Sequence, residues 1–146
     1  MKEPVTARTG VLELKARNES IPLMIERING ELNQVSCPDS VRRHIDVAID
    51  EIGANIASYA YSDVSDGSIP RDMTLRYEIG EGYAILTFSD SGKPFDPLQA
   101  EEPLIGGMPQ LGGFGIHIVR NIMDHLEYTY RNGQNCLRVT KTWTGQ

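Results

Sequence analysis

Three glycines lead directly into an amphipathic helix at residues 111–120 (LGGFGIHIVR), and this feature restricts the fold of the chain more than any other. A helix that begins behind glycines leaves the backbone N–H groups of its first turn uncovered, and the helix dipole adds partial positive charge there. Such a helix end suits a phosphate group. A glycine-rich turn before a helix is more often simple punctuation, however, so its meaning depends on the segments that precede it.

The apolar pattern predicts the remaining elements. Alternating apolar and polar side chains predict strands at 10–16, 73–79, 83–89, 126–131 and 136–143. Apolar residues three and four apart predict helices near 20–35, at 39–61 with Asp39 or Ser40 as its cap, and at 113–124. Gly80-Glu81-Gly82 and Asn132-Gly133 are typical hairpin turns. The order predicts an α/β two-layer sandwich (α+β), with helices covering one face of a mixed, mostly antiparallel sheet.

One long segment, residues 90–110, carries four prolines and shows no period. In so compact a chain, a loop of this length is more than a connection between two elements. We expect it to be a lid or a binding loop.

Composition excludes several classes of protein. The chain has 146 residues, is 40% hydrophobic and carries a formal net charge of −6. These values fit one domain over 1–146 and argue against a general binder of nucleic acid or anionic membranes. Cys37 and Cys136 have no metal-ligand spacing, so we expect reduced thiols, although a single disulfide between them stays open. No apolar run approaches membrane-spanning length, and we expect a soluble, cytoplasmic protein.

Two polar residues on the second predicted helix, Glu51 and Asn55, lie one turn apart and therefore project from one face. An Asn carbonyl is a hard oxygen ligand that suits Mg²⁺, which takes few protein ligands in addition to phosphate oxygens and water. A carboxylate one turn away can accept the proton of a hydroxyl that attacks a γ-phosphate. Solvated surface is the common alternative for such a pair.

The strand at 83–89 ends in Asp90-Ser91-Gly92. A carboxylate can accept a hydrogen bond from an exocyclic amine, and Gly92 lets a flat ring approach the backbone closely. A simple turn at the end of a strand often has the same sequence, so this is the structural alternative. The order of the three motifs, on a helix, at a strand end and at a helix N-terminus, is what gives them weight together.

Together the motifs resemble the GHKL ATPase superfamily, whose Bergerat ATP-binding fold is shared by gyrase and histidine kinases. Glu51-Ile52-Gly53-Ala54-Asn55 looks like its N box, Asp90-Ser91-Gly92 like its first glycine box, and Gly112-Gly113-Phe114-Gly115 like its second. The phrases DSGKPFDP and GGFGIHIVRNIMD most resemble bacterial anti-sigma-factor serine/threonine kinases. Such kinases bind a sigma factor and phosphorylate a serine on a STAS-domain anti-sigma antagonist.

The resemblance implies a role for each matching residue, with ATP and Mg²⁺ as cofactors. Glu51 would be the general base, and Asn55 would coordinate the Mg²⁺. Asp90 would bind the adenine amine beside Gly92, and the loop 95–111 would be the ATP lid. The remaining binding residues would be the phosphate-facing Gly112, Gly113 and Gly115 and, through water, Thr140 on the last strand.

Two departures from the family pattern bear on activity. Ile56 and Tyr59 replace the usual Ala and His after the N box, and residues 94–115 contain no Arg or Lys to reach a γ-phosphate. Lys93 and Arg120 are the candidate substitutes. A second hypothesis is therefore a catalytically weak or inactive nucleotide-binding module that regulates by sequestering its partner. Relatives in this group often dimerise, so a homodimer stays open, whereas nucleic acid and membranes are not expected partners.

Overall fold

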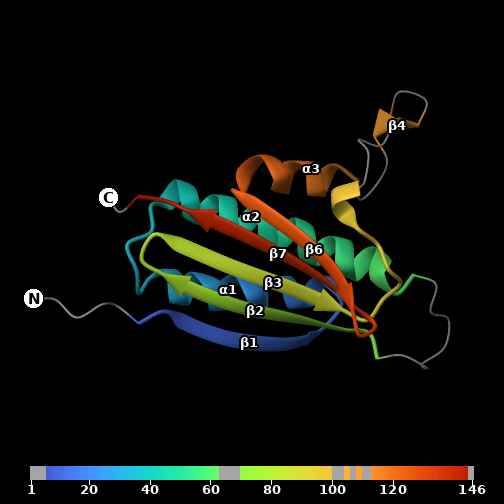
Figure 1. Cartoon of the computed structure of the whole chain (residues 1–146), viewed down its shortest axis with the longest axis horizontal. Helices are drawn as coiled ribbons and strands as arrows, with labels where there is room; N and C mark the ends of the chain where they lie inside the picture. Colours follow the sequence, from blue (N-terminus) through green and yellow to red (C-terminus); the bar gives the residue numbers. More distant parts are fainter. Residues whose placement is uncertain (1–5, 63–69, 100–103, 106–107, 110–112, 145–146) are drawn as a thin grey trace, which may run out of the picture.

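A computed structural model describes residues 6–62, 70–99, 104–105, 108–109 and 113–144 (Figure 1). Five strands form one sheet in the order β1-β2-β3-β7-β6, and every neighbouring pair is antiparallel. Two short strands, β4 and β5, pair separately. The bounds are β1 Arg8–Lys15, β2 Asp72–Gly80, β3 Tyr83–Asp90, β4 Leu104–Ile105, β5 Met108–Pro109, β6 His125–Arg131 and β7 Gln134–Thr142.

The predicted turns between β2 and β3 and between β6 and β7 are confirmed. Gly80 pairs with Tyr83 across the first turn, where Gly82 has a φ of 87°. The second turn places both Asn132 (φ 54°) and Gly133 (φ 77°) in the left-handed region, as a tight hairpin of twisted strands requires.

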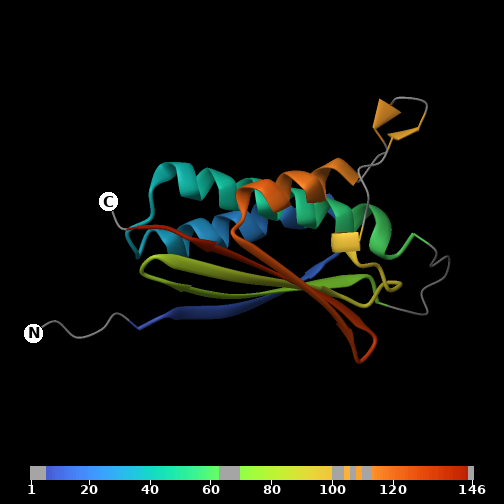
Figure 2. The same cartoon turned by 45° about the horizontal axis from the view of Figure 1, so that its top comes forward.

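Among the described residues, three α-helices cover one face of the sheet, and α2 packs between α1 and α3 (Figure 2). The two-layer arrangement expected from the sequence is confirmed. No helix in the described part of the chain is long and apolar enough to cross a membrane. The helical elements are η1 Asn18–Ser20, α1 Ile21–Leu32, α2 Asp39–Asn55, η2 Ile56–Ala60, η3 Pro97–Gln99 and α3 Gly113–Ile122.

The core fills the space between the helices and the covered face of the sheet. Ile45 and Ile49 of α2 meet alternate residues of β3 and β7, such as Leu86 and Val139, and all four side chains are fully buried. The period of two along the strands and the three-four spacing along α2 therefore place the apolar residues in one layer. The cysteines, Cys37 and Cys136, are both free.

The second helix differs from its prediction at both ends. Asp39 is its first residue instead of its cap, because Pro38 occupies the cap position and no side chain caps the helix. At the other end, the α-helix stops at Asn55 and continues as one turn of π-helix, η2. Such a wider turn changes the direction of the following chain and is frequent near functional sites.

Candidate functional site

The elements that carry several predicted site residues come to one end of the molecule, where β3 and α2 end and α3 begins (Figure 1). The segment after β3 is tied to the end of η2, because the Lys93 N–H donates to the Ala60 carbonyl oxygen at 3.3 Å. Asp90, at the end of β3, pairs with Asn135 at the start of β7. The structure thus places the DSG motif beside the turn that directly follows Asn55.

Asp90 continues the inward-facing row of β3 after the apolar Leu86 and Phe88, and only 7% of its surface is exposed. Its Oδ1 accepts hydrogen bonds from the Gly92 N–H at 2.9 Å and from Asn135 Nδ2 at 3.0 Å. Burial raises the pKa of the Asp90 carboxyl, and these two hydrogen bonds act in the opposite direction. Both bonds go to one oxygen, so Oδ2 has no partner among the described residues and can accept a ligand amine.

Gly92 lies against the backbone of the π-helical turn. A Cβ built on Gly92 would sit 2.1 Å from the carbonyl oxygen of Ala60 and 2.6 Å from its carbonyl carbon. The close approach therefore requires glycine for a reason that the sequence did not reveal: the neighbour within this distance is the protein's own backbone.

Tyr61 hydrogen-bonds to two backbone segments next to Gly92. Its hydroxyl donates to the backbone oxygen of Asp72 at 2.6 Å and accepts from the Ser91 N–H at 2.8 Å. Burial raises the pKa of this phenol, so it stays neutral and can act as donor and acceptor at once. The hydroxyl thus links the start of β2 to the DSG motif.

Glu51 and Asn55 lie half-buried on α2, one turn apart, as predicted. Neither side chain makes a hydrogen bond or an ion pair with any described residue. A free carboxylate and a free amide oxygen on one helix face are groups that a ligand can use. The described residues hold no cluster of three or more His, Cys, Asp or Glu side chains, so a Mg²⁺ ion here would need phosphate oxygens and water to complete its coordination, which is how this ion usually binds.

The glycine-led helix α3 begins at Gly113, so Gly113 and Gly115 form part of its first turn. Gly112 lies outside the described residues, and so does much of the predicted lid at 95–111. The start of α3 lies at the same end of the molecule as the end of α2 (Figure 1). A helix N-terminus of this kind carries backbone N–H groups and partial positive charge that suit a phosphate.

Thr140 does not join this site. It pairs with Ile85, which lies five residues before Asp90 on β3, a separation of about 16 Å at the usual rise per residue. Its position in the alternation of β7 puts it on the face opposite to Val139, away from the helices. Thr140 therefore lies far from the Asp90 carboxylate, and its expected support of an adenine site stays a prediction that the register does not favour.

Asn135 occupies the strand position that faces Asp90, and sequence reasoning missed it. Its alternation with Leu137 and Val139 places a polar residue on the buried face of β7, and only 8% of its surface is exposed. A polar residue at an inward position of an alternating strand is the signal that was available, because buried polar groups require hydrogen-bond partners.

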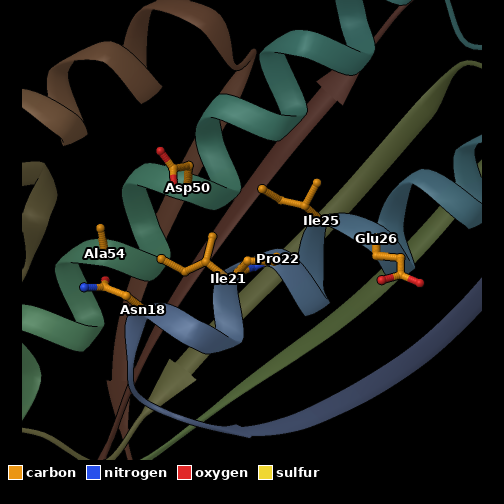
Figure 3. Close-up of a pocket in the computed structure, with 7 residues that line it drawn as sticks. All are labelled: Asn18, Ile21, Pro22, Ile25, Glu26, Asp50 and Ala54. Carbon is orange, nitrogen blue, oxygen red and sulfur yellow. The ribbon is translucent and has the colours of Figure 1, made fainter.

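A separate groove of about 440 Å³ lies between α1 and α2, lined among others by Ile21, Ile25, Asp50 and Ala54 (Figure 3). Asp50 and Ala54 each precede a predicted site residue by one position, a rotation of about 100° around the helix. The groove is therefore on a different face of α2 from Glu51 and Asn55, and it is not part of the candidate site.

Comparison with known proteins places the chain in a family. The sequence pattern of the histidine kinase-like ATPase domain matches residues 14–141, nearly the whole chain. The chain belongs to this family. Membership in the histidine kinase-like ATPase domain family implies the use of ATP, and the matched range includes the three predicted motifs.

Relatives in the family are named as protein kinases. The chain is 25% identical over 130 residues to the serine-protein kinase RsbW of Listeria innocua, covering 84% of this chain and 80% of the relative. It is 32% identical over 103 residues to the serine/threonine-protein kinase BtrW of Bordetella bronchiseptica, covering 68% of this chain and 70% of the relative.

A solved structure shares the fold of this histidine kinase-like ATPase domain. The crystal structure of the RsbU and RsbW domains of Rv1364c from Mycobacterium tuberculosis matches 92% of the chain, with a TM-score of 0.65 and 11% identity. The chain spans about a third of that larger protein, 32%. At this identity the likeness supports the arrangement of helices and strands alone.

Proposed function

We propose that the chain is an ATP-dependent serine/threonine protein kinase of the anti-sigma-factor type, which binds a sigma factor and phosphorylates a serine on a STAS-domain antagonist. The observation that carries this proposal is the buried Asp90 carboxylate with one oxygen left for a ligand, at the end of the molecule that also holds Asn55 and the start of α3. The kinase names of two relatives support the type of reaction.

Each site residue then has a chemical task. Asp90 accepts a hydrogen bond from the 6-amino group of adenine, and Asn55 contributes one oxygen to a Mg²⁺ ion that neutralises phosphate charge. Backbone N–H groups of Gly112, Gly113 and Gly115 bind phosphate oxygens at the start of α3. Glu51 takes the proton of the substrate serine as its oxygen attacks the γ-phosphate.

Glu51→Gln tests the base. We expect transfer to a STAS-domain protein to fall by about 10²–10⁴-fold while MgATP binding is retained, because general base catalysis contributes this much to rates. Asp50→Asn is the matched control, since it removes a carboxylate one residue earlier on another face of α2. Phosphorylation is measured by the mass of the STAS protein. Transfer at the normal rate by Glu51→Gln would contradict the assignment.

Asn55→Ala tests the metal site by calorimetric titration with MgATP. We expect about a tenfold or greater loss of affinity, and little further loss when magnesium is omitted, because both changes remove the same interaction. If omission of magnesium weakened binding to the variant as strongly as to the parent protein, Asn55 would not be the ligand.

A second candidate function is a nucleotide-binding module that sequesters its partner without phosphorylating it. The lack of Arg and Lys at 94–115 favours it, because charge stabilisation is a large part of phosphoryl transfer. A STAS partner that binds in the presence of MgATP and never gains the mass of a phosphate would identify this alternative.

A further inference from the structure

The side chain of Asn135 makes five hydrogen bonds, three of them to the backbone of residues 92–95, which lead into the predicted lid and are called its root below. Its Nδ2 donates to Asp90 Oδ1 at 3.0 Å and to the backbone oxygens of Gly92 at 3.3 Å and Lys93 at 2.9 Å. Its Oδ1 accepts from the Phe95 N–H at 3.1 Å and from the Tyr128 hydroxyl. One buried amide therefore contacts both the Asp90 carboxylate and the chain that leads into the lid.

We infer that Asn135 is a positioning residue for base recognition: it orients the Asp90 carboxylate toward the 6-amino group of a purine and fixes the backbone of residues 92–95 to the same point. This inference rests on the proposed function, because it takes Asp90 as the acceptor of the adenine amine. It adds a residue on β7 that couples the base site to the root of the lid.

The chemistry of the position calls for an amide. A carboxylate at position 135 would have no donor for Asp90 and would place a second negative charge beside it. A hydroxyl has a single donor, which cannot serve Asp90 and the two backbone oxygens together. The two N–H donors of the amide serve Asp90 and the Gly92 and Lys93 carbonyls, with one N–H shared between two acceptors, while the amide oxygen faces the Phe95 N–H.

The contact with Asn135 also decides which oxygen of Asp90 is available. Oδ1 is occupied by Asn135 and by the Gly92 N–H, so the carboxylate is held with Oδ2 toward a ligand. Without the amide, the buried carboxylate would keep a single described donor and could rotate. A rotated acceptor would lose the directional hydrogen bond that distinguishes adenine from a purine without an amino group.

The test compares the binding of ATP with that of purine riboside triphosphate, which lacks only the 6-amino group. We expect the parent protein to prefer ATP by about tenfold or more, the value of one hydrogen bond to a charged group. Asn135→Leu and Asn135→Asp should both lose this preference, with affinity for purine riboside triphosphate changed by less than about threefold. A general loss of structure would instead weaken the binding of both nucleotides equally.

Hydrogen exchange at the Phe95 amide distinguishes the contact of Asn135 with Phe95 from its contact with Asp90. Asn135→Asp keeps an oxygen acceptor for this N–H, whereas Asn135→Leu removes it, so only the leucine variant should exchange faster. Arg131→Ala, at an exposed position of the same hairpin, is the control and should change neither readout. If Asn135→Leu does not fold, Asn135→Asp, which preserves the side-chain volume, carries the nucleotide comparison alone.

The outcomes distinguish this inference from the proposed function. A parent protein that binds neither nucleotide would refute the proposed function itself. A parent protein that binds both nucleotides equally would show that Asp90 does not contact the amine, and this result would refute the inference. A parent protein that prefers ATP, with both Asn135 variants keeping that preference, would overturn the role of Asn135 and leave the proposed function intact.

Discussion

Replacing Gly92 with alanine places a methyl group against the backbone of η2. The new Cβ would lie 2.1 Å from the Ala60 carbonyl oxygen, 2.6 Å from its carbonyl carbon and 2.9 Å from its Cα. Ordinary contacts between carbon atoms begin near 3.5 Å, so the two segments must separate by roughly 1 Å. Because all three neighbours are backbone atoms, no side-chain rotation can relieve the overlap.

The cost follows from two contributions. Overpacking of this kind typically destabilises a protein by about 1–3 kcal/mol. The separation also breaks the hydrogen bond from the Lys93 N–H to the Ala60 oxygen, which contributes about 0.5–1.5 kcal/mol. We therefore expect Gly92→Ala to lower the free energy of unfolding by about 2–4 kcal/mol, a large part of the 5–15 kcal/mol that is usual for a domain.

Gly30→Ala is the matched control for this substitution. Gly30 lies inside α1, and a Cβ built there would meet nothing within 4 Å. Alanine is favoured over glycine in a helix interior by about 0.5–1 kcal/mol, so the same chemical change should stabilise the protein. Urea unfolding followed by circular dichroism measures both variants. Equal midpoints for Gly92→Ala and the parent protein, with unchanged slopes, would refute the reasoning.

Two further substitutions test the charge of Asp90 and the hydrogen bonds of Tyr61, which both lie beside Gly92. Asp90→Asn should abolish the preference for ATP, and above about pH 4 the variant should become increasingly more stable than the parent protein. Burial raises the pKa of Asp90, so the parent protein loses stability as the pH rises from the ordinary aspartate pKa through the raised one, and the variant does not. Equal pH profiles of thermal unfolding for the two proteins would contradict this. Tyr61→Phe should destabilise the protein by about 1–3 kcal/mol, because it leaves the Asp72 carbonyl and the Ser91 N–H without their partner, and an unchanged urea midpoint would speak against that bridge.

The fold was predictable because each element shows its own period. Alternation gave all five strands of the sheet to within two residues at each end, and the turn residues Gly82, Asn132 and Gly133 gave both hairpins. The π-helical turn η2 was not predictable, because the spacing of Ile52 and Ile56 fits an uninterrupted α-helix. This turn packs against Gly92 and accepts a hydrogen bond from the Lys93 N–H, and such tertiary contacts leave no local sequence pattern.

Residues of the candidate site could be named from the sequence where a motif carries the chemistry, but not where strand register decides their position. Glu51, Asn55 and Asp90 stood out by type and order along the chain. Thr140 was placed in the site by family resemblance alone, and the pairing of β3 with β7 puts Asn135 at that end instead. β3 and β7 are far apart in the chain, so no turn between them fixes their register, and a one-residue or five-residue error cannot be seen until the strands are paired.

The source of positive charge for the γ-phosphate is the remaining question about catalysis, and the structure separates the two candidates. Arg120 is in the last turn of α3, seven residues from Gly113, so it lies about 10 Å along the helix axis from the end that would bind phosphate. Lys93 is exposed at the root of the lid, beside the Ala60 carbonyl, and its Nζ lies 3.4 Å from Ser62 Oγ at the end of η2.

We therefore expect Lys93, rather than Arg120, to supply positive charge to the phosphates. If the protein transfers phosphate, Lys93→Met should lower the rate of transfer to the STAS partner by about 10²-fold, the usual effect of removing one transition-state contact, with MgATP affinity changed much less. Arg120→Met is the control of equal charge and should leave the rate within about threefold of the parent protein. A larger loss for Arg120→Met than for Lys93→Met would contradict the assignment of Lys93 and make Arg120 the cation that contacts the phosphates.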